Sequence, residues 1–288
     1  MKFIHTFWSK PLHKNKFNKF NASLEVILQN YAYSFTCAKR LGKDIVLYAD
    51  EFGAELLSFI PYDDVKIVNG LDNESIHFAA QIKFAALKDC ELGDAIIDGD
   101  LFIRKQTALD VIDDSSPDIL YSFFEPYMFT LQDDSIHKYY NSAFKIFNKY
   151  EFEYPYVPAM HFSELEWMNT SLIKINNQKL KDEYIEQYYK HKAMLDNEEY
   201  DNFWPDIFIE QMFLTQLCSV KNYKAKPVIE HFYFDARANE KALELGFTHL
   251  GSDKQVHLPW VDQLFLDEAP DLFYKYREQF EKYKQKGS

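Results

Sequence analysis

Short apolar runs alternate with segments of helical periodicity over residues 3–103, and this alternation constrains the fold more than any other feature of the sequence. The runs are rich in β-branched and aromatic residues and are too short for core helices, so each predicts a strand, and the runs at residues 44–50 and before Asp98 predict buried strands. The predicted strands cover residues 3–8, 44–50, 65–68 and the run that ends at Asp98.

The segments between these strands repeat apolar residues every three or four positions, which is the period of an amphipathic helix. They cover residues 23–41, 51–59 and 75–90. Asn21 or Ser23 is expected to cap the first helix and Gly42 to end it. Strand and helix in regular alternation predict an α/β fold of the Rossmann type, with a mixed, largely parallel sheet and flanking helices.

The rest of the chain predicts further strands and helices, and a proline-broken loop at residues 154–162 that is a candidate lid. Strands are predicted at residues 118–124, 165–176 and 226–234. Helices are predicted at residues 134–149, 179–192 and 206–218, with two more from residue 255 to about residue 283. We expect one catalytic domain over residues 1–255 and a C-terminal helical extension, residues 256–286, packed on the same domain.

The apolar run that ends at Asp98 opens directly onto the acidic sequence Asp98-Gly99-Asp100. Ligands bind at the carboxyl ends of strands in open α/β sheets, and two acids one residue apart can both turn toward one hard cation if the backbone bends at Gly99. This pattern predicts a metal site for a diphosphate. An Asp-Gly turn in a hairpin explains the same residues and remains an alternative.

Composition limits the partners of the protein. The formal net charge is -13 over 288 residues, which disfavours nucleic acid as the main partner because that binding depends on Lys and Arg. A basic segment contains Lys10, Lys14, Lys16 and Lys19, which favours a solvated loop over a phosphate or membrane-surface contact. The three cysteines lie far apart and no apolar run is long enough to span a bilayer, so a cytoplasmic protein is expected.

Three further stretches bear on Asp98 and Asp100. They are Trp167-Met168-Asn169-Thr170-Ser171, Glu210-Gln211-Met212 and His249-Leu250-Gly251-Ser252-Asp253-Lys254. With the Asp-x-Asp sequence they resemble, in order and spacing, the nucleotide-sugar glycosyltransferases of the GT-A type, most closely the retaining enzymes of family 8. The sequence departs from that pattern in three respects. Ser171 replaces a Gly, Glu210 replaces an Asp, and the last motif is one residue shorter.

The resemblance implies a role for each matching residue. It implies that Mn²⁺ or Mg²⁺ is bound by Asp98, Asp100 and His249. It implies contacts with a nucleoside-diphosphate sugar donor at Lys83, Asp98, Gly251 and Lys254. It implies that the sugar and the reaction centre are faced by Asn169, Glu210 and Gln211. The acceptor would be a carbohydrate or a lipid-linked molecule, and a peripheral membrane contact is compatible with this assignment.

Two alternatives from other classes remain. Asp98-Gly99-Asp100 after an apolar strand also resembles the haloacid-dehalogenase type phosphatases, but Phe102 stands where that family has Thr or Val, and no later Gly-Asp-x-x-x-Asp sequence follows. A non-catalytic carbohydrate-binding protein on the same fold is the second alternative, against which the metal and diphosphate residues argue.

Overall fold

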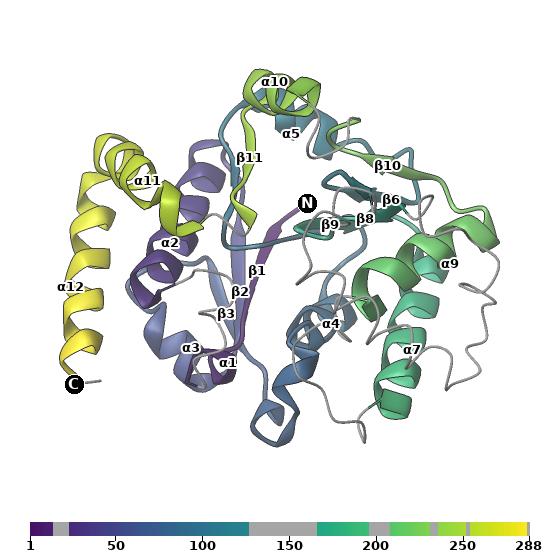
Figure 1. Cartoon of the computed structure of the whole chain (residues 1–288), viewed down its shortest axis with the longest axis horizontal. Coiled ribbons are helices and arrows are strands. Elements are labelled where there is room, and N and C mark those ends of the chain that lie inside the picture. Colours follow the sequence, from purple (N-terminus) through teal and green to yellow (C-terminus); the bar gives the residue numbers. More distant parts are fainter. Residues whose placement is uncertain (14–22, 127–165, 196–207, 231–235, 252–253, 287–288) are drawn as a thin grey trace. The chain divides into compact units, whose positions relative to one another are not determined.

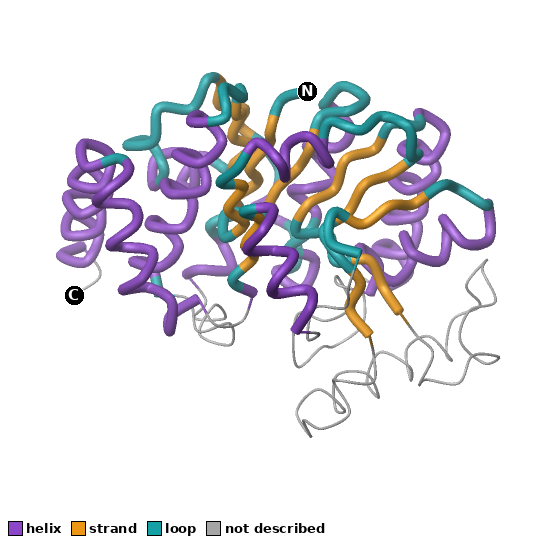
Figure 2. The backbone as a smooth tube through the Cα atoms, turned by 90° about the horizontal axis from the view of Figure 1, so that it is seen from above, coloured by secondary structure: helices purple, strands orange, loops and turns teal. Residues whose placement is uncertain are grey.

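The computed structural model describes residues 1–13, 23–126, 166–195, 208–230, 236–251 and 254–286 (Figure 1). The chain divides into two compact units. The first unit contains Met1–Asn73, Asp94–Asp113 and Leu243–Ser288, and the second contains Glu74–Gly93 and Asp114–Ala242. One of the boundaries falls inside helix α10 (Ala236–Leu245). Helices and strands of the described residues are distinguished by colour in Figure 2.

The first unit is built on parallel strands in the order β4-β1-β2-β3. Their bounds are β1 (Phe3–Phe7), β2 (Ile45–Ala49), β3 (Asp64–Ile67) and β4 (Ala95–Ile97). Every residue of β1, β2 and β4 is buried, which explains why these strands read as continuous apolar runs rather than as alternating patterns. Phe3 of β1 lies opposite Ile45 on one side and Ala95 on the other, which fixes the register.

Helices complete the first unit, and α11 and α12 pack on α2 (Figure 1). The helices are α1 (Lys10–His13), α2 (Leu24–Arg40), α3 (Glu51–Leu56), α5 (Gln106–Ile112), α11 (Lys254–Glu268) and α12 (Pro270–Lys286), with a 3-10 turn at Leu71–Asn73. The hydroxyl of Ser23 accepts from the backbone N of Val26 and caps α2, and Gly42 follows the helix with a φ of 69°. The predicted cap at Ser23 and stop at Gly42 are therefore confirmed.

Two further strands of the first unit bring the Asp98-Gly99-Asp100 sequence and the motif that begins at His249 together. Strand β5 (Leu101–Ile103) pairs antiparallel with β11 (Phe247–His249), with His249 opposite Leu101. The backbone N of Leu250 also donates to the carbonyl of Asp100 over 3.2 Å. The C-terminal motif is thus held beside the Asp-x-Asp sequence by backbone hydrogen bonds, independently of any side chain.

In the second unit, β6 (Ile119–Tyr121) pairs parallel with β10 (Ala225–Pro227) and antiparallel with β9 (Leu172–Ile175). Strand β7 (Phe124–Pro126) pairs antiparallel with β8 (Glu166–Met168). The helical elements are a 3-10 turn at Ile76–Phe78, α4 (Gln81–Asp89), α7 (Gln178–Leu195), a π-helical turn at Phe208–Met212 and α9 (Phe213–Lys221).

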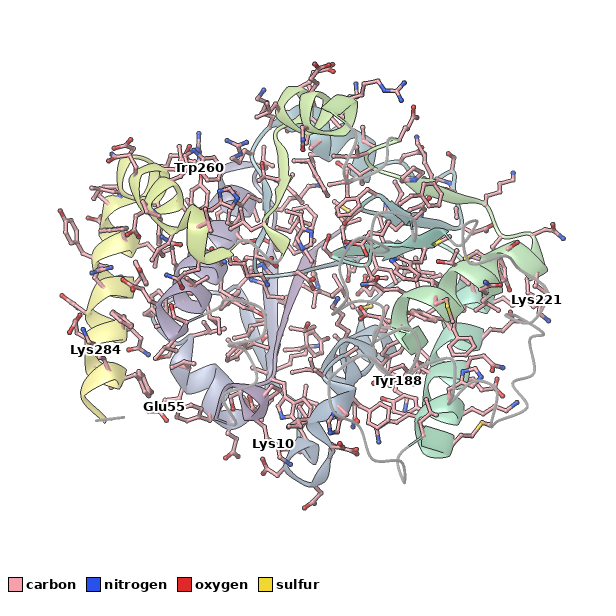
Figure 3. All side chains as sticks on the ribbon, viewed as in Figure 1. Lys10, Glu55, Tyr188, Lys221, Trp260 and Lys284 are labelled. Atoms are coloured by element: carbon pink, nitrogen blue, oxygen red, sulfur yellow. The ribbon has the colours of Figure 1, made fainter. Side chains whose placement is uncertain are left out.

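Aromatic packing joins α4 to α7 in this unit. Tyr188, labelled in Figure 3, stacks on Phe84 with ring centroids 3.5 Å apart and an interplanar angle of 11°. Tyr184 approaches the edge of the same ring at 4.8 Å. All three side chains are buried, so part of the large aromatic content of the chain forms the core of the second unit.

The predicted α/β class is confirmed, since parallel pairings predominate and helices flank the strands. Three predicted elements are interrupted. The helix at residues 75–90 is a 3-10 turn followed by α4, the strand at residues 165–176 is β8 and β9 joined by a turn, and the helix at residues 206–218 begins as a π-helical turn. The spacing of apolar residues does not distinguish these interrupted elements from continuous ones.

Other predictions differ in extent or fall outside the described residues. Within the described residues, the late strand predicted at residues 226–234 is β10 (Ala225–Pro227), and helix α10 lies where no element was predicted. The helix at residues 134–149, the candidate lid at residues 154–162 and three of the four basic-segment lysines lie outside the described residues. The two C-terminal helices are confirmed, whereas the division at residues 255 and 256 stays a prediction. Among the described helices, none combines the length and the apolar character needed to cross a membrane.

Candidate functional site

The Asp98-Gly99-Asp100 sequence forms a turn between β4 and β5. The backbone N of Leu101 donates to the carbonyl of Asp98 over 3.0 Å, which closes a four-residue turn. It is not a hairpin turn, because β4 pairs with β1 and β5 pairs with β11. The chain leaves the parallel strands at this turn and enters the antiparallel pair, so both carboxylates lie at the carboxyl end of β4.

Tyr31 of α2 packs against this turn from the side of Gly99. A Cβ atom on Gly99 would lie 2.4 Å from Cε2 of Tyr31, so only glycine fits there with the ring in place. The hydroxyl of Tyr31 donates to the carbonyl of Thr6 over 2.6 Å. Burial, followed by the charges of Asp98 and Asp100, holds the pKa of Tyr31 well above its ordinary value. Tyr31 is therefore neutral and packs against one side of the turn.

Asp98, Asp100 and His249 form the candidate metal centre. Each offers one ligand atom, and these atoms all lie within 4.8 Å of one another. Carboxylate oxygens with an imidazole nitrogen suit Mn²⁺, and carboxylates also suit Mg²⁺. Oδ2 of Asp100 is buried and lies beside an ammonium group and an imidazole, so this carboxylate oxygen already faces positive charge. The three side chains thus fit the predicted ion.

Lys254, the first residue of α11, is the fourth side chain of this cluster. Its Nζ lies 3.0 Å from Oδ2 of Asp100, and Nε2 of His249 lies 3.5 Å from the same oxygen. Burial acts to raise the pKa of Asp100, but the charges of Lys254 and His249 outweigh it and hold that pKa below its ordinary value. Gly251, just before α11, has a φ of 57°, a conformation that glycine adopts without strain.

The other predicted site residues belong to the second unit, where Glu210 and Lys83 form a buried ion pair. Nζ of Lys83 lies 2.8 Å from Oε1 of Glu210 and donates to the carbonyl of Thr170 over 3.2 Å. The hydroxyl of Thr170 donates to the same Glu210 oxygen over 2.6 Å. Tyr184 donates to the backbone carbonyl of Glu210 over 2.7 Å. This network fixes the π-helical turn against the turn between β8 and β9.

Asn169 and Gln211 have different surroundings in the same unit. Nδ2 of Asn169 donates to Oε1 of Glu125 over 2.6 Å, and its Oδ1 accepts from the backbone N of Ser171 over 2.9 Å. Oε1 of Gln211 is buried and, among the described residues, accepts no hydrogen bond. The predicted residues therefore form two groups, one in each unit: Asp98, Asp100, His249, Gly251 and Lys254 in the first, and Lys83, Asn169, Glu210 and Gln211 in the second.

Sequence reasoning missed Tyr31, Thr170 and Glu125. Glu125 follows the strand predicted at residues 118–124, and an acid directly after a strand is the same signal that identified Asp98. Tyr31 and Thr170 carry no such signal, because one is a core-like aromatic in a helix and the other a hydroxyl in a strand. Their positions depend on tertiary contacts alone.

Comparison with known proteins gives a family and two similar folds. A family model described as "Family of unknown function (DUF6734)" matches residues 1–282. No curated protein matches the chain. Among solved structures, the galactosyltransferase LgtC in complex with donor and acceptor sugar analogs is similar with 11% identity and a TM-score of 0.39, over 73% of this chain and 70% of that one.

The glycosyltransferase GlyE of Streptococcus pneumoniae TIGR4 is similar with 10% identity and a TM-score of 0.39, and the match covers 98% of this chain and 64% of that one. The family model spans nearly the whole chain. The chain belongs to the family of unknown function DUF6734.

Proposed function

We propose that this protein is a metal-dependent glycosyltransferase that moves a sugar from a nucleoside-diphosphate donor to a carbohydrate or lipid-linked acceptor, with retention of anomeric configuration. The observation that carries the proposal is the convergence of Asp98, Asp100, His249 and Lys254 in the first unit. Two carboxylates, an imidazole and an ammonium group are the set needed to hold a divalent cation together with a diphosphate.

Each residue of the first unit has a defined part in this proposal. Asp98, Asp100 and His249 would ligate Mn²⁺ or Mg²⁺, and Lys254 would pair with the diphosphate. Gly251, with its positive φ, lets the backbone turn between β11 and α11 beside these side chains. A bound divalent ion would neutralise charge that develops on the leaving diphosphate. Lys254 would add a second positive charge beside the same leaving group.

The residues of the second unit are assigned to the sugar. Asn169 and Gln211 are proposed to face the sugar and the reaction centre, and Glu210 to hold Lys83 where it supports the donor. Lys83 and Glu210 would act as a pair, because each already neutralises the other in a buried contact. The cytoplasmic location, the peripheral membrane contact and the domain division at residue 255 belong to the same proposal and rest on the sequence.

The test is direct binding of donors by the full chain. Isothermal titration with UDP-glucose, UDP-galactose and GDP-mannose, each with and without Mn²⁺, is expected to show binding only with the metal, because the diphosphate otherwise meets Asp98 and Asp100 as like charges. The variant Asp100→Asn should lose metal-dependent binding, and the matched variant Asp110→Asn, at an exposed position of α5, should keep it. Unchanged affinity in excess EDTA would remove the metal assignment.

A further inference from the structure

Two glutamates contact the turn between β8 and β9 in the second unit, and their partners differ. Glu210 reaches the turn through Thr170, and Glu125 of β7 reaches it through Asn169. Glu210 was predicted from sequence to act on the sugar, whereas Glu125 was not. The contacts of the two residues indicate the opposite, with Glu125 and not Glu210 as the group that contacts the sugar.

Glu210 is already neutralised and enclosed. Its Oε1 accepts from the Lys83 ammonium at 2.8 Å and from the Thr170 hydroxyl at 2.6 Å. The Glu210 and Lys83 side chains are only 8% and 13% exposed. A buried carboxylate with a cation in contact presents no net charge to a ligand, and separating the pair would leave an uncompensated charge in a site with little water. These contacts fit a positioning residue better than a group that touches the substrate.

Glu125 is half-buried, and its hydrogen-bond donors among the described residues are neutral. Its Oε2 accepts from the indole Nε1 of Trp167 over 2.9 Å and its Oε1 accepts from Nδ2 of Asn169 over 2.6 Å. Among the described residues no Lys, Arg or His forms an ion pair with it. Each carboxylate oxygen accepts two hydrogen bonds when fully engaged, so within the part of the chain that the structure describes each oxygen of Glu125 has one further acceptor position.

The groups that hold Glu125 are themselves fixed. Trp167 and Asn169 are buried, and the backbone of Asn169 exchanges hydrogen bonds with Phe123 and Ser122 over 2.9 and 3.1 Å. Pairing of β7 with β8 places Glu125 directly opposite Trp167. The carboxylate is therefore preorganised, which is what a hydroxyl-binding group needs if it is to bind without an ordering cost.

We propose that Glu125, oriented by Trp167 and Asn169, is the carboxylate that binds the hydroxyl groups of a hexose, and that Glu210 is a positioning residue that acts through Thr170 and Lys83. Two hydroxyls of a hexose can donate to the remaining acceptor positions of this carboxylate, one on each oxygen, and charge-assisted hydrogen bonds of this kind are stronger than neutral ones. This inference rests on the proposed function, since it names the group that recognises the sugar.

The experiment compares a nucleotide with its sugar conjugate on the full chain with Mn²⁺. Titration of UDP and UDP-glucose, and of GDP and GDP-mannose, gives the affinity added by the sugar as the ratio of the two dissociation constants. In Glu125→Gln we expect that ratio to fall at least tenfold while nucleotide affinity stays at the wild-type value. Trp167→Phe keeps the carboxylate and removes one donor, so a smaller fall is expected. Thermal unfolding of each variant reports whether the fold is retained.

The outcomes separate this inference from the proposed function. A sugar ratio in Glu125→Gln equal to that of wild type would overturn the role of Glu125 while leaving glycosyl transfer intact. If wild-type protein binds none of the nucleotides or nucleotide sugars, the proposed function fails, and saturation-transfer NMR with free glucose, galactose and mannose tests Glu125 alone. Signals that wild type gives and Glu125→Gln loses would support it, and signals absent from wild type or retained by the variant would overturn it.

Discussion

The ammonium nitrogen of Lys254 lies 3.0 Å from Oδ2 of Asp100, the carboxylate that a divalent cation would share with Asp98 and His249. Lys254 stands in the first turn of α11, and that turn contains no acidic residue. A positive charge at a helix N-terminus is unfavourable, so Asp100 is the group that holds Lys254 in place. Lys254 and a divalent cation therefore compete for the Asp100 carboxylate. A bound diphosphate relieves this competition, because it can form an ion pair with Lys254.

Replacing Lys254 by Met should accordingly have two effects of opposite sign. Mn²⁺ alone should bind the variant roughly tenfold more tightly, about 1.4 kcal/mol, because a repelling cation is gone. Pyrophosphate in the presence of Mn²⁺ should bind more weakly, by about 1.5–3 kcal/mol for a charge-assisted contact. Isothermal titration measures both. His249→Ala is the matched variant and should weaken Mn²⁺ binding; weaker Mn²⁺ binding in Lys254→Met would contradict the competition.

Gly99 is the position at which the turn is most sensitive to size. Gly99→Ala should destabilise the fold by about 1–3 kcal/mol and weaken Mn²⁺ binding, because the new methyl group meets the Tyr31 ring at 2.4 Å. Adding Tyr31→Ala should recover part of the metal affinity, since it removes the ring that the methyl group meets. Urea unfolding and Mn²⁺ titration over the double-mutant cycle measure the coupling. Independent, additive effects would show that Tyr31 does not define the turn.

The parallel strands and the metal residues could be predicted because their signals are local. Apolar runs of strand length identify β1, β2 and β4, and the acids that follow β4 carry their own chemical meaning. His249 and Lys254 could be placed beside them only through the resemblance to a known family. The pairing of β5 with β11 then brings them there.

The partners of Glu125, Gly99 and Glu210 could not be predicted, because each is a contact between segments distant in sequence. Glu125 contacts Asn169 only when β7 pairs with β8. Because a continuous strand was predicted at residues 165–176, the turn that contains Asn169 was not expected. Glu210 stands in a π-helical turn, where its direction differs from that in the α-helix expected from periodicity. The spacing of apolar residues does not distinguish a π-helical turn from an α-helix.

The Lys83–Glu210 pair should be costly to break and inexpensive to replace. Glu210→Gln removes the carboxylate charge that lies 2.8 Å from the buried Lys83 ammonium, so urea unfolding should show a loss of about 3–5 kcal/mol. The double variant Lys83→Met with Glu210→Leu should recover most of that loss, because neither buried group is then charged. Lys43→Met, which removes a partner of the half-exposed Asp113, is the matched control and should cost less than about 1 kcal/mol. A double variant as unstable as the single one would show that the network has another role.

His5 makes stability depend on pH at mildly acidic values. Its Nε2 lies 3.0 Å from the hydroxyl of Ser34, which itself donates to the carbonyl of Leu101, and its Nδ1 lies 2.9 Å from the hydroxyl of Tyr62. The ring is fully buried, and burial lowers the pKa of His5 to about 3. A neutral ring that donates to Ser34 and accepts from Tyr62 satisfies all of these groups.

The sign of the pH effect follows from the difference between the two states. The unfolded chain binds a proton at His5 below about pH 6.5 and the folded chain does so only below about pH 3, so the stability contributed by the neutral ring is lost as the pH falls through this window. Between pH 7 and pH 5 the loss should be about 2 kcal/mol greater in wild type than in His5→Gln, as measured by urea unfolding. All other ionisable groups are the same in the two proteins, so their contributions cancel in the difference. Equal losses in the two proteins would mean that His5 takes up its proton within the folded state.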